Sequence, residues 1–207
     1  TMALAEMTAL DTEQTAFIYD FNDGSTATDK SGLGNDGVIG ANNVTFVSGD
    51  NCFDNSSCLS LDASDGINSS NGSISSTRLT STDMTFSAWF KLNQLGQREV
   101  IIDNYNNRLD VRSDGTIIAS FETDQAGGTN FEYLIYPMPN DNDWHHVVST
   151  IKSGEYTRLY LDGELVAESK AGYTLDPSYG FSLNVFCSTF SAIIVPLSLS
   201  FIGKPYK

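Results

Sequence analysis

The chain has 207 residues, of which 40% are hydrophobic, and this is enough to bury the core of one large β-sandwich or two small domains. Its 11 basic and 26 acidic residues give a formal net charge of -15 at pH 7, so a phosphate backbone would be repelled and we expect no nucleic-acid partner. The longest apolar runs, such as 192–197, fall far short of the roughly 20 residues that a membrane helix needs, so we expect no transmembrane segment.

The acidic residues are 18 aspartates and only 8 glutamates. Aspartate favours turns and oxygen-rich loops, whereas glutamate favours helix faces. The excess of aspartate therefore makes calcium a candidate ligand.

The N-terminal stretch Thr1–Thr15 has a helix-favouring composition, and we expect it to form an arm outside a domain at residues 16–207. After it, short apolar or alternating runs separated by Gly, Asn, Asp and Ser recur along nearly the whole chain. This pattern is typical of an all-β fold, an antiparallel two-sheet β-sandwich or jelly roll. The clearest predicted strands are Ala16–Phe21, Cys58–Asp62, Met84–Lys91, Glu99–Asp103, Gly115–Phe121, Phe131–Tyr136, His145–Ile151, Tyr156–Leu161 and Glu164–Glu168.

Two local patterns define these strands further. In Met84–Lys91 apolar side chains alternate with a mixed set, which indicates one buried face. The pair Asp162-Gly163 predicts a type I′ hairpin turn, because that turn needs positive φ at both central residues. A second turn is predicted at Ser113–Gly115.

The cysteines and the glycosylation sequons concentrate in one region. Cys52 and Cys58 flank a short polar loop that suits a hairpin disulfide, with two free thiols as the alternative, and Cys187 is left over. A bridge would place the protein in an oxidising compartment. The sequons, at Asn43, Asn55, Asn68 and Asn71, indicate an exposed, loop-rich region where glycans could be attached.

Patterns for catalysis are weak. His145 and His146 are adjacent, so on a strand they point to opposite faces and cannot hold one metal together, and a histidine-based triad is not expected. Glu122 and Asp124 could share a strand face like the paired carboxylates of a glucanase, but the third acid of that pattern is missing and two glycines follow. We therefore predict that the protein is not an enzyme.

Five blocks of the chain resemble, in the family's order, the laminin-G-like modules of the concanavalin-A-like lectin/glucanase superfamily. They extend over residues 16–170 and are Phe17–Gly24 with Asp29–Gly37, Cys58–Asp62, Met84–Lys91, Trp144–Ser149 and Leu159–Ala167. The resemblance implies a jelly roll and an extracellular or cell-surface location. Such modules serve glycan binding, cell adhesion and protein recognition, so the resemblance alone does not select one function.

The chain departs from the family pattern near its C-terminal end. Leu197–Gly203 looks like the family's strand that ends in Ile-Gly, but no last strand follows it, and residues 171–195 have no counterpart. Residues such as Phe181–Phe186 could supply the missing edge internally, a neighbouring chain could donate it, or it could lie beyond Lys207.

The family often carries a structural calcium ion near its opening strand and the loop that follows. The matching positions here are Asp20, Asn22, Asp29 and Asn35, with Asp62 or Asp65 as additions. Carboxylate and amide oxygens are the ligands that calcium takes. Ca²⁺ is therefore the expected cofactor, in a structural role.

Glycan recognition needs an exposed aromatic ring to stack on a sugar, together with planar amides and carboxylates for its hydroxyl groups. The most lectin-like combination in the sequence is Tyr105 among Asp103, Asn104, Asn106 and Asn107. Trp89 also lies on a mixed strand face, but the resemblance implies that it packs against neighbouring structure.

Three functions follow from these observations. The first is a non-catalytic recognition or adhesion module that binds a glycan or an extracellular protein, with calcium as a candidate requirement. The alternative is a self-assembling subunit of an extracellular filament or surface layer, in which copies of the chain are joined by strand donation. The third, a carbohydrate-active enzyme, lacks a placed pair of acids.

Overall fold

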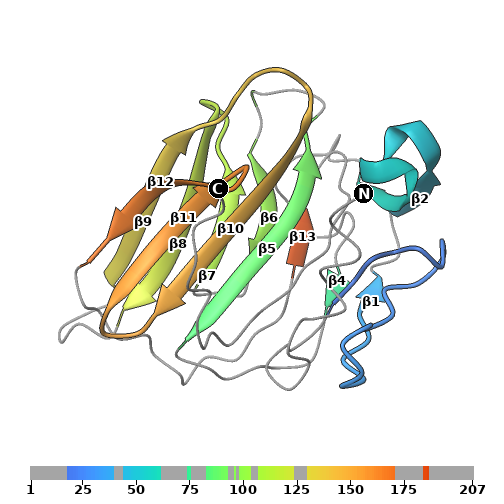
Figure 1. Ribbon diagram of the computed structural model, residues 1–207, viewed down its shortest axis with the longest axis horizontal. Helices are drawn as coiled ribbons and strands as arrows, with labels where there is room; N and C mark the ends of the chain where they lie inside the picture. Colours follow the sequence, from blue (N-terminus) through green and yellow to red (C-terminus); the bar gives the residue numbers. More distant parts are fainter. Residues whose placement is uncertain are drawn as a thin grey trace.

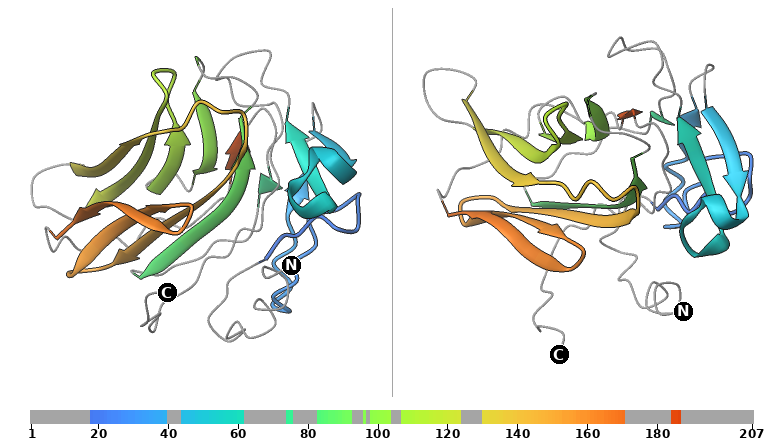
Figure 2. Two further views of the ribbon diagram at one scale, coloured as in Figure 1. Left: turned by 45° about the horizontal axis from the view of Figure 1, so that its top comes forward. Right: turned by 90° about the horizontal axis from the view of Figure 1, so that it is seen from above.

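The computed structural model describes residues 18–39, 44–61, 74–75, 83–92, 96, 98–103, 107–123, 130–170 and 184–186. Within these residues the protein consists chiefly of two antiparallel sheets that face each other (Figure 1, Figure 2). The predicted all-β, two-sheet sandwich is therefore confirmed. The expected arm, Thr1–Thr15, lies outside the described residues.

The first sheet has five strands in the order β13-β6-β7-β8-β9, and the second has four in the order β12-β11-β10-β5. The strands of the first are β6 (Glu99–Asp103), β7 (Asn107–Val111), β8 (Thr116–Thr123), β9 (Asn130–Pro137) and β13 (Asn184–Phe186). Those of the second are β5 (Met84–Lys91), β10 (Trp144–Lys152), β11 (Tyr156–Leu161) and β12 (Glu164–Ser169).

The core lies between the two sheets and follows from alternation along the strands. In β5, Met84, Phe86 and Phe90 are buried and belong to the core cluster, as the alternation predicts. Leu109 of β7 and Phe121 of β8 face them from the other sheet and are also buried. The positions of β7 and β8 that alternate with these core residues point to the outer face of the five-stranded sheet.

Both predicted turns are present. Asp162 and Gly163 have φ values of 51° and 85° and join β11 to β12, which matches the prediction of a type I′ turn. Gly115 has φ 81° and donates its N–H to the carbonyl of Arg112 (2.9 Å), closing the turn before β8.

The N-terminal described segment lies beside the sandwich, at the side away from β9 and β12 (Figure 1, Figure 2). It contains two small sheets, β2 (Val44–Ser48) paired with β3 (Ser57–Leu61) and β1 (Val38–Ile39) paired with β4 (Ile74–Ser75). Two 3-10 helices, η1 (Gly49–Asn51) and η2 (Phe53–Asn55), connect β2 to β3. The predicted disulfide joins Cys52 to Cys58 across this hairpin, with 5.6 Å between the Cα atoms.

One predicted strand is wrong in the part that can be compared. Residues 18–21 of the expected strand Ala16–Phe21 form no strand, although Tyr19 and Phe21 are buried in the core. Phe21 has φ 54° and its carbonyl accepts the N–H of Gly24 (3.0 Å), so the chain turns where the alternation predicted an extended segment.

The edge strand beside β6 is supplied from within the chain. Residues Asn184–Phe186 form β13 and pair antiparallel with β6, with Asn184 opposite Asp103 and Phe186 opposite Val100. The region without a counterpart in the family pattern thus contributes a strand to the five-stranded sheet. The source of the family's last strand stays a prediction. The segment Leu197–Gly203 lies outside the described residues.

Candidate functional site

The loop with the expected calcium ligands is held together by its own hydrogen bonds. Asp29 is 7% exposed, and both of its carboxylate oxygens accept hydrogen bonds from the chain. The donors are the N–H groups of Ile18, Ser31 and Asn35 and the hydroxyl of Ser31, at 2.7–3.0 Å. Burial by itself would raise the pKa of Asp29, but these hydrogen bonds outweigh it and lower that pKa below its usual value.

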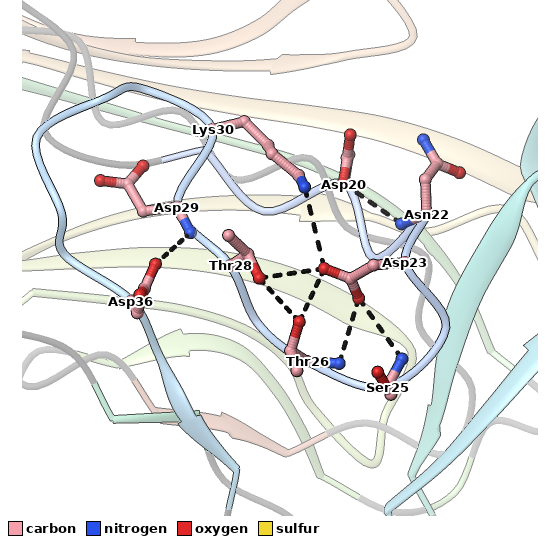
Figure 3. Close-up of polar contacts among 9 residues, drawn as sticks. All are labelled: Asp20, Asn22, Asp23, Ser25, Thr26, Thr28, Asp29, Lys30 and Asp36. Carbon is pink, nitrogen blue, oxygen red and sulfur yellow. Dashed lines mark hydrogen bonds and ion pairs between the residues drawn. The ribbon is translucent and has the colours of Figure 1, made fainter.

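A second carboxylate in this loop, Asp23, was not among the predicted ligands. Figure 3 shows it in contact with Ser25, Thr26, Thr28 and Lys30. The hydroxyls of Thr26 and Thr28 donate to Asp23 Oδ2 at 2.6 and 2.9 Å, and Lys30 Nζ lies 3.7 Å from the same oxygen. The Thr26 hydroxyl is the main cause of a pKa of Asp23 well below its usual range. The Asp23 carboxylate therefore links residues 23–30 of the loop through hydrogen bonds and an ion pair.

Side-chain oxygens of three described calcium candidates accept hydrogen bonds from the chain. Asp20 Oδ1 accepts the N–H of Asn22 (3.2 Å), and Asn22 Oδ1 accepts the N–H of Ser57 (3.4 Å), so, as in Asp29, side-chain oxygens face donors of the chain. A calcium ion would have to bind beside these donors, on the lone pairs that they leave. Among the described residues no group of three or more His, Cys, Asp or Glu side chains could hold a metal. Asp62 and Asp65 lie outside the described residues.

The predicted glycosylation sites are described at one position only. Asn55 ends η2, is exposed and has φ 53°, so its side chain is accessible to a modifying enzyme. The other three, Asn43, Asn68 and Asn71, lie outside the described residues. Glycosylation stays a prediction at all four.

The predicted lectin-like loop is described only at its two ends. Residues 104–106, including Tyr105, lie outside the described residues, and Asp103 is placed by its backbone in β6. Asn107 begins β7 with 6% exposure, and its amide nitrogen lies 3.9 Å from the Met84 sulfur. Asn107 therefore points into the sandwich, away from a surface where a glycan could lie.

The two histidines face opposite ways, as predicted. His146 Nε2 lies 2.8 Å from Ser87 Oγ, and its ring stacks on Trp89, with 4.9 Å between ring centroids. Trp89 in turn stacks on Phe53 of η2 at 3.7 Å, which confirms that Trp89 packs against neighbouring structure. His145 is 7% exposed and lies between Asp162 (Nδ1 to Oδ2, 2.8 Å) and Asp141 (Nε2 to Oδ1, 3.0 Å).

This arrangement predicts a pH effect. Burial lowers the pKa of His145, but the hydrogen bonds to Asp162 and Asp141 outweigh it and raise the pKa above the usual value. The stabilisation is then complete below the ordinary histidine pKa and is lost as pH rises through the raised one. We expect His145→Gln to cost less than about 1 kcal/mol, because both partners are half exposed, and to cost more at pH 5.5 than at pH 8.5. Urea denaturation at both pH values measures this, and an equal cost would contradict it.

A pocket of about 250 Å³ lies on the outer face of the five-stranded sheet. Three arginines, Arg98, Arg108 and Arg112, line it together with Asp110 and the two aromatic residues Phe131 and Tyr133. Ile118 and Ser120 of β8 complete the lining. Because these residues alternate along β7, β8 and β9 with the core residues, the pocket opens away from the interior.

Strand register brings these distant residues together. Arg108 of β7 pairs with Ser120 of β8, which pairs with Tyr133 of β9. Neighbouring strands lie about 4.8 Å apart, so Arg108 and Tyr133 flank Ser120 across roughly 10 Å of sheet. A sugar ring laid over Ser120 would have a guanidinium on one side and an aromatic ring on the other.

The aromatic side chains of the pocket are exposed to solvent. Phe131 and Tyr133 are 40% and 49% exposed, and their ring centroids are 6.2 Å apart. The next outward residue of β9, Ile135, is 51% exposed. Large apolar side chains grouped on one strand face are more informative than single exposed ones, because they mark interaction surfaces.

The charged side of the pocket contains one ion pair and one arginine that makes none. Asp110 is buried, with 2% of its side chain exposed, and Arg98 Nε donates to its Oδ2. Arg112 is exposed at the end of β7, and within the part of the chain that the structure describes its guanidinium has no carboxylate within ion-pair distance. The nearby Asp114 accepts the hydroxyl and N–H of Thr116.

This pocket was not predicted from the sequence. Two signals were available, the alternating Arg108-x-Asp110-x-Arg112 and Phe131-x-Tyr133-x-Ile135. Taken alone, each pattern predicts only a strand with one polar or apolar face and indicates no site. Only the pairing of β7, β8 and β9 places them on one surface.

The described residues form a jelly-roll sandwich with an open aromatic and polar pocket on one sheet face. The family model of the concanavalin A-like lectin/glucanases superfamily matches residues 64–187, more than half of the chain. The chain belongs to this superfamily. None of the curated proteins shows significant sequence similarity to it.

Solved structures of binding domains share the fold. The binding domain of Paraclostridial Mosquitocidal Protein 1 matches with a TM-score of 0.69 and 14% identity, over 92% of this chain and 50% of that one. The binding domain of Botulinum Neurotoxin DC in complex with SialylT gives 0.69 and 14% over 92% and 49%. This chain thus spans about half of those domains.

A third structure is matched over nearly its whole length. Domain 4 of AbnA, a GH43 extracellular arabinanase from Geobacillus stearothermophilus, in complex with arabinotriose, gives a TM-score of 0.62 and 12% identity over 89% of this chain and 93% of that one. At such identities the likeness shows the fold alone.

Proposed function

We propose that the protein is a non-catalytic glycan-binding module of an extracellular or cell-surface protein, and that its glycan lies on the outer face of the five-stranded sheet. The observation that carries the proposal is the pocket in which the exposed rings of Phe131 and Tyr133 stand beside arginine side chains. Aromatic rings supply the flat apolar surface on which a sugar ring packs, and guanidinium and hydroxyl groups bind its oxygens.

The comparisons support a binding module. The arabinanase domain is in complex with arabinotriose and the neurotoxin domain with SialylT, so this fold presents surfaces to glycans in those proteins. Another neurotoxin binding domain is in complex with rat synaptotagmin II, so a protein ligand is the second candidate. The combination of aromatic, charged and hydroxyl side chains in one small pocket favours the glycan here.

Other features agree with this role. The disulfide between Cys52 and Cys58 suits an oxidising, extracellular compartment. No helix among the described residues is long and apolar enough to cross a membrane. Of the acids considered for catalysis, Glu122 is buried on β8 with 7% exposure, and Asp124 lies outside the described residues.

Binding to a glycan array tests the proposal. We expect the wild-type chain to bind a defined set of glycans, and the double variant Phe131→Ala/Tyr133→Ala to bind them more than about tenfold more weakly, because two stacking surfaces are lost. The matched control is Leu165→Ala, which removes a side chain that is 51% exposed on β12 of the other sheet. Equal binding by the double variant and the control would contradict the proposed site.

Calcium dependence stays a prediction, and the same array tests it. Loss of binding on addition of EDTA, restored by excess calcium, would support a required ion. Binding that is unchanged by EDTA would leave the sheet-face site in place without a calcium requirement.

A further inference from the structure

The distribution of positive charge is uneven. The chain has five arginines and a net charge of -15, yet three of the five line this one pocket. Only one carboxylate, Asp110, lines it with them. On a protein whose overall field repels anions, this pocket is a local site of opposite charge.

The arginines have different surroundings. Arg98 is bound to the buried Asp110, so its charge is compensated within the protein. Arg112 makes no ion pair among the described residues, although its charge helps to lower the pKa of the neighbouring Asp114. It is exposed at one end of the pocket, level with Thr116 and Pro137, four residues along β9 from Tyr133. Arg112 is therefore the group best placed to receive a charge from outside.

The chemistry of the Arg112 guanidinium limits the chemical class of the ligand. The guanidinium is planar, always charged, and offers paired N–H donors that match the two oxygens of a carboxylate or sulfate. A neutral sugar hydroxyl uses only one such donor and leaves the charge uncompensated. The volume of about 250 Å³ is below the roughly 300–1,000 Å³ of sites for drug-sized ligands, which fits a short piece of a glycan.

We propose that the ligand is an acidic glycan, whose carboxylate or sulfate group is bound by Arg112 while a neighbouring sugar ring of the same glycan packs on Tyr133 and Phe131. This inference rests on the proposed glycan-binding function and adds the chemical class of the ligand. Uronic acids, sialic acids and sulfated sugars share the required group, and the test distinguishes them.

The test compares acidic glycans with neutral counterparts of the same sugar. The probes are tetragalacturonate and its methyl ester, sialyllactose and lactose, and a heparin tetrasaccharide with and without its sulfate groups. We expect the wild-type chain to bind at least one acidic form about tenfold or more tightly than its neutral counterpart, measured by isothermal titration calorimetry. The pair that shows the difference identifies the acidic group.

Variants assign the preference to Arg112. Arg112→Gln should bring the ratio of acidic to neutral affinity close to one, and Arg112→Lys should keep a reduced preference, since a lysine retains the charge without the paired donors. Lys170→Gln is the control, because it removes the same charge from a side chain that is 76% exposed next to β12. Thermal unfolding of each variant checks that it is folded.

The outcomes separate the two proposals. If neutral and acidic forms bind equally, or if the preference survives in Arg112→Gln, the acidic-glycan inference is wrong while the glycan-binding function stands. If neither the acidic nor the neutral form of any probe binds, and the chain also binds no glycan on the array, the proposed glycan-binding function is wrong. Binding of a protein ligand alone at this face would overturn both.

Discussion

Arg98→Met is expected to lower the free energy of unfolding by about 3–5 kcal/mol, because it leaves the Asp110 carboxylate buried without its partner. The Asp110 side chain is 2% exposed, and Arg98 is its ion-pair partner. Chemical denaturation in urea at pH 7 measures the loss.

A matched control exists in the same pocket. Arg112→Met removes the same charge and substitutes the same side chain, but Arg112 is exposed and makes no ion pair among the described residues. Its cost should stay below about 0.5 kcal/mol. The double variant Arg98→Met/Asp110→Leu should recover most of the loss, because it also removes the buried charge. If Arg98→Met and Arg112→Met lower the free energy of unfolding equally, the ion pair between Arg98 and Asp110 does not stabilise the fold.

Asp29→Ala is expected to lower the free energy of unfolding by about 3 kcal/mol, since it removes the acceptor of three backbone N–H groups and one hydroxyl in a part-buried loop. The control is Asp50→Ala, an exposed aspartate of η1. Guanidinium denaturation of both variants gives the comparison, and a loss no larger than that of Asp50→Ala would contradict the structural role.

The cost of Asp29→Ala should also depend on pH. Because the folded-state pKa of Asp29 is lowered, its carboxylate stabilises the fold above the ordinary aspartate pKa of about 3.9. That contribution is lost as pH falls through the lowered value. The difference between wild type and Asp29→Ala should therefore be larger at pH 7 than at pH 3.

The strands were predictable where alternation and burial agree. Met84–Lys91 and Tyr156–Leu161 have the predicted bounds, because one face of each contributes to the core and each pairs with neighbouring strands. At residues 18–21 the same apolar pattern is buried, but the backbone there bonds to Asp29 and Lys30 instead of to a strand. Alternation predicts burial more directly than it predicts strand pairing.

The site was less predictable for two physical reasons. An aspartate in a loop can bind a cation or accept N–H groups of its own turn, and the sequence shows the oxygen atoms without the direction of the donors around Asp29. The pocket depends on register, since Arg108 and Tyr133 are neighbours only through Ser120 of the strand between them. Predicting it requires the sheet order.

The most direct test of the glycan site is an NMR titration of the ¹⁵N-labelled chain with the glycan that binds most tightly on the array. If the account is right, the largest amide shifts fall on the outer face of β7, β8 and β9, at residues such as Arg112, Ser120 and Tyr133. They should disappear in Phe131→Ala/Tyr133→Ala. Shifts concentrated in the Asp20–Asp36 loop or on the four-stranded sheet, or no shifts at saturating glycan, would contradict a glycan site on this face.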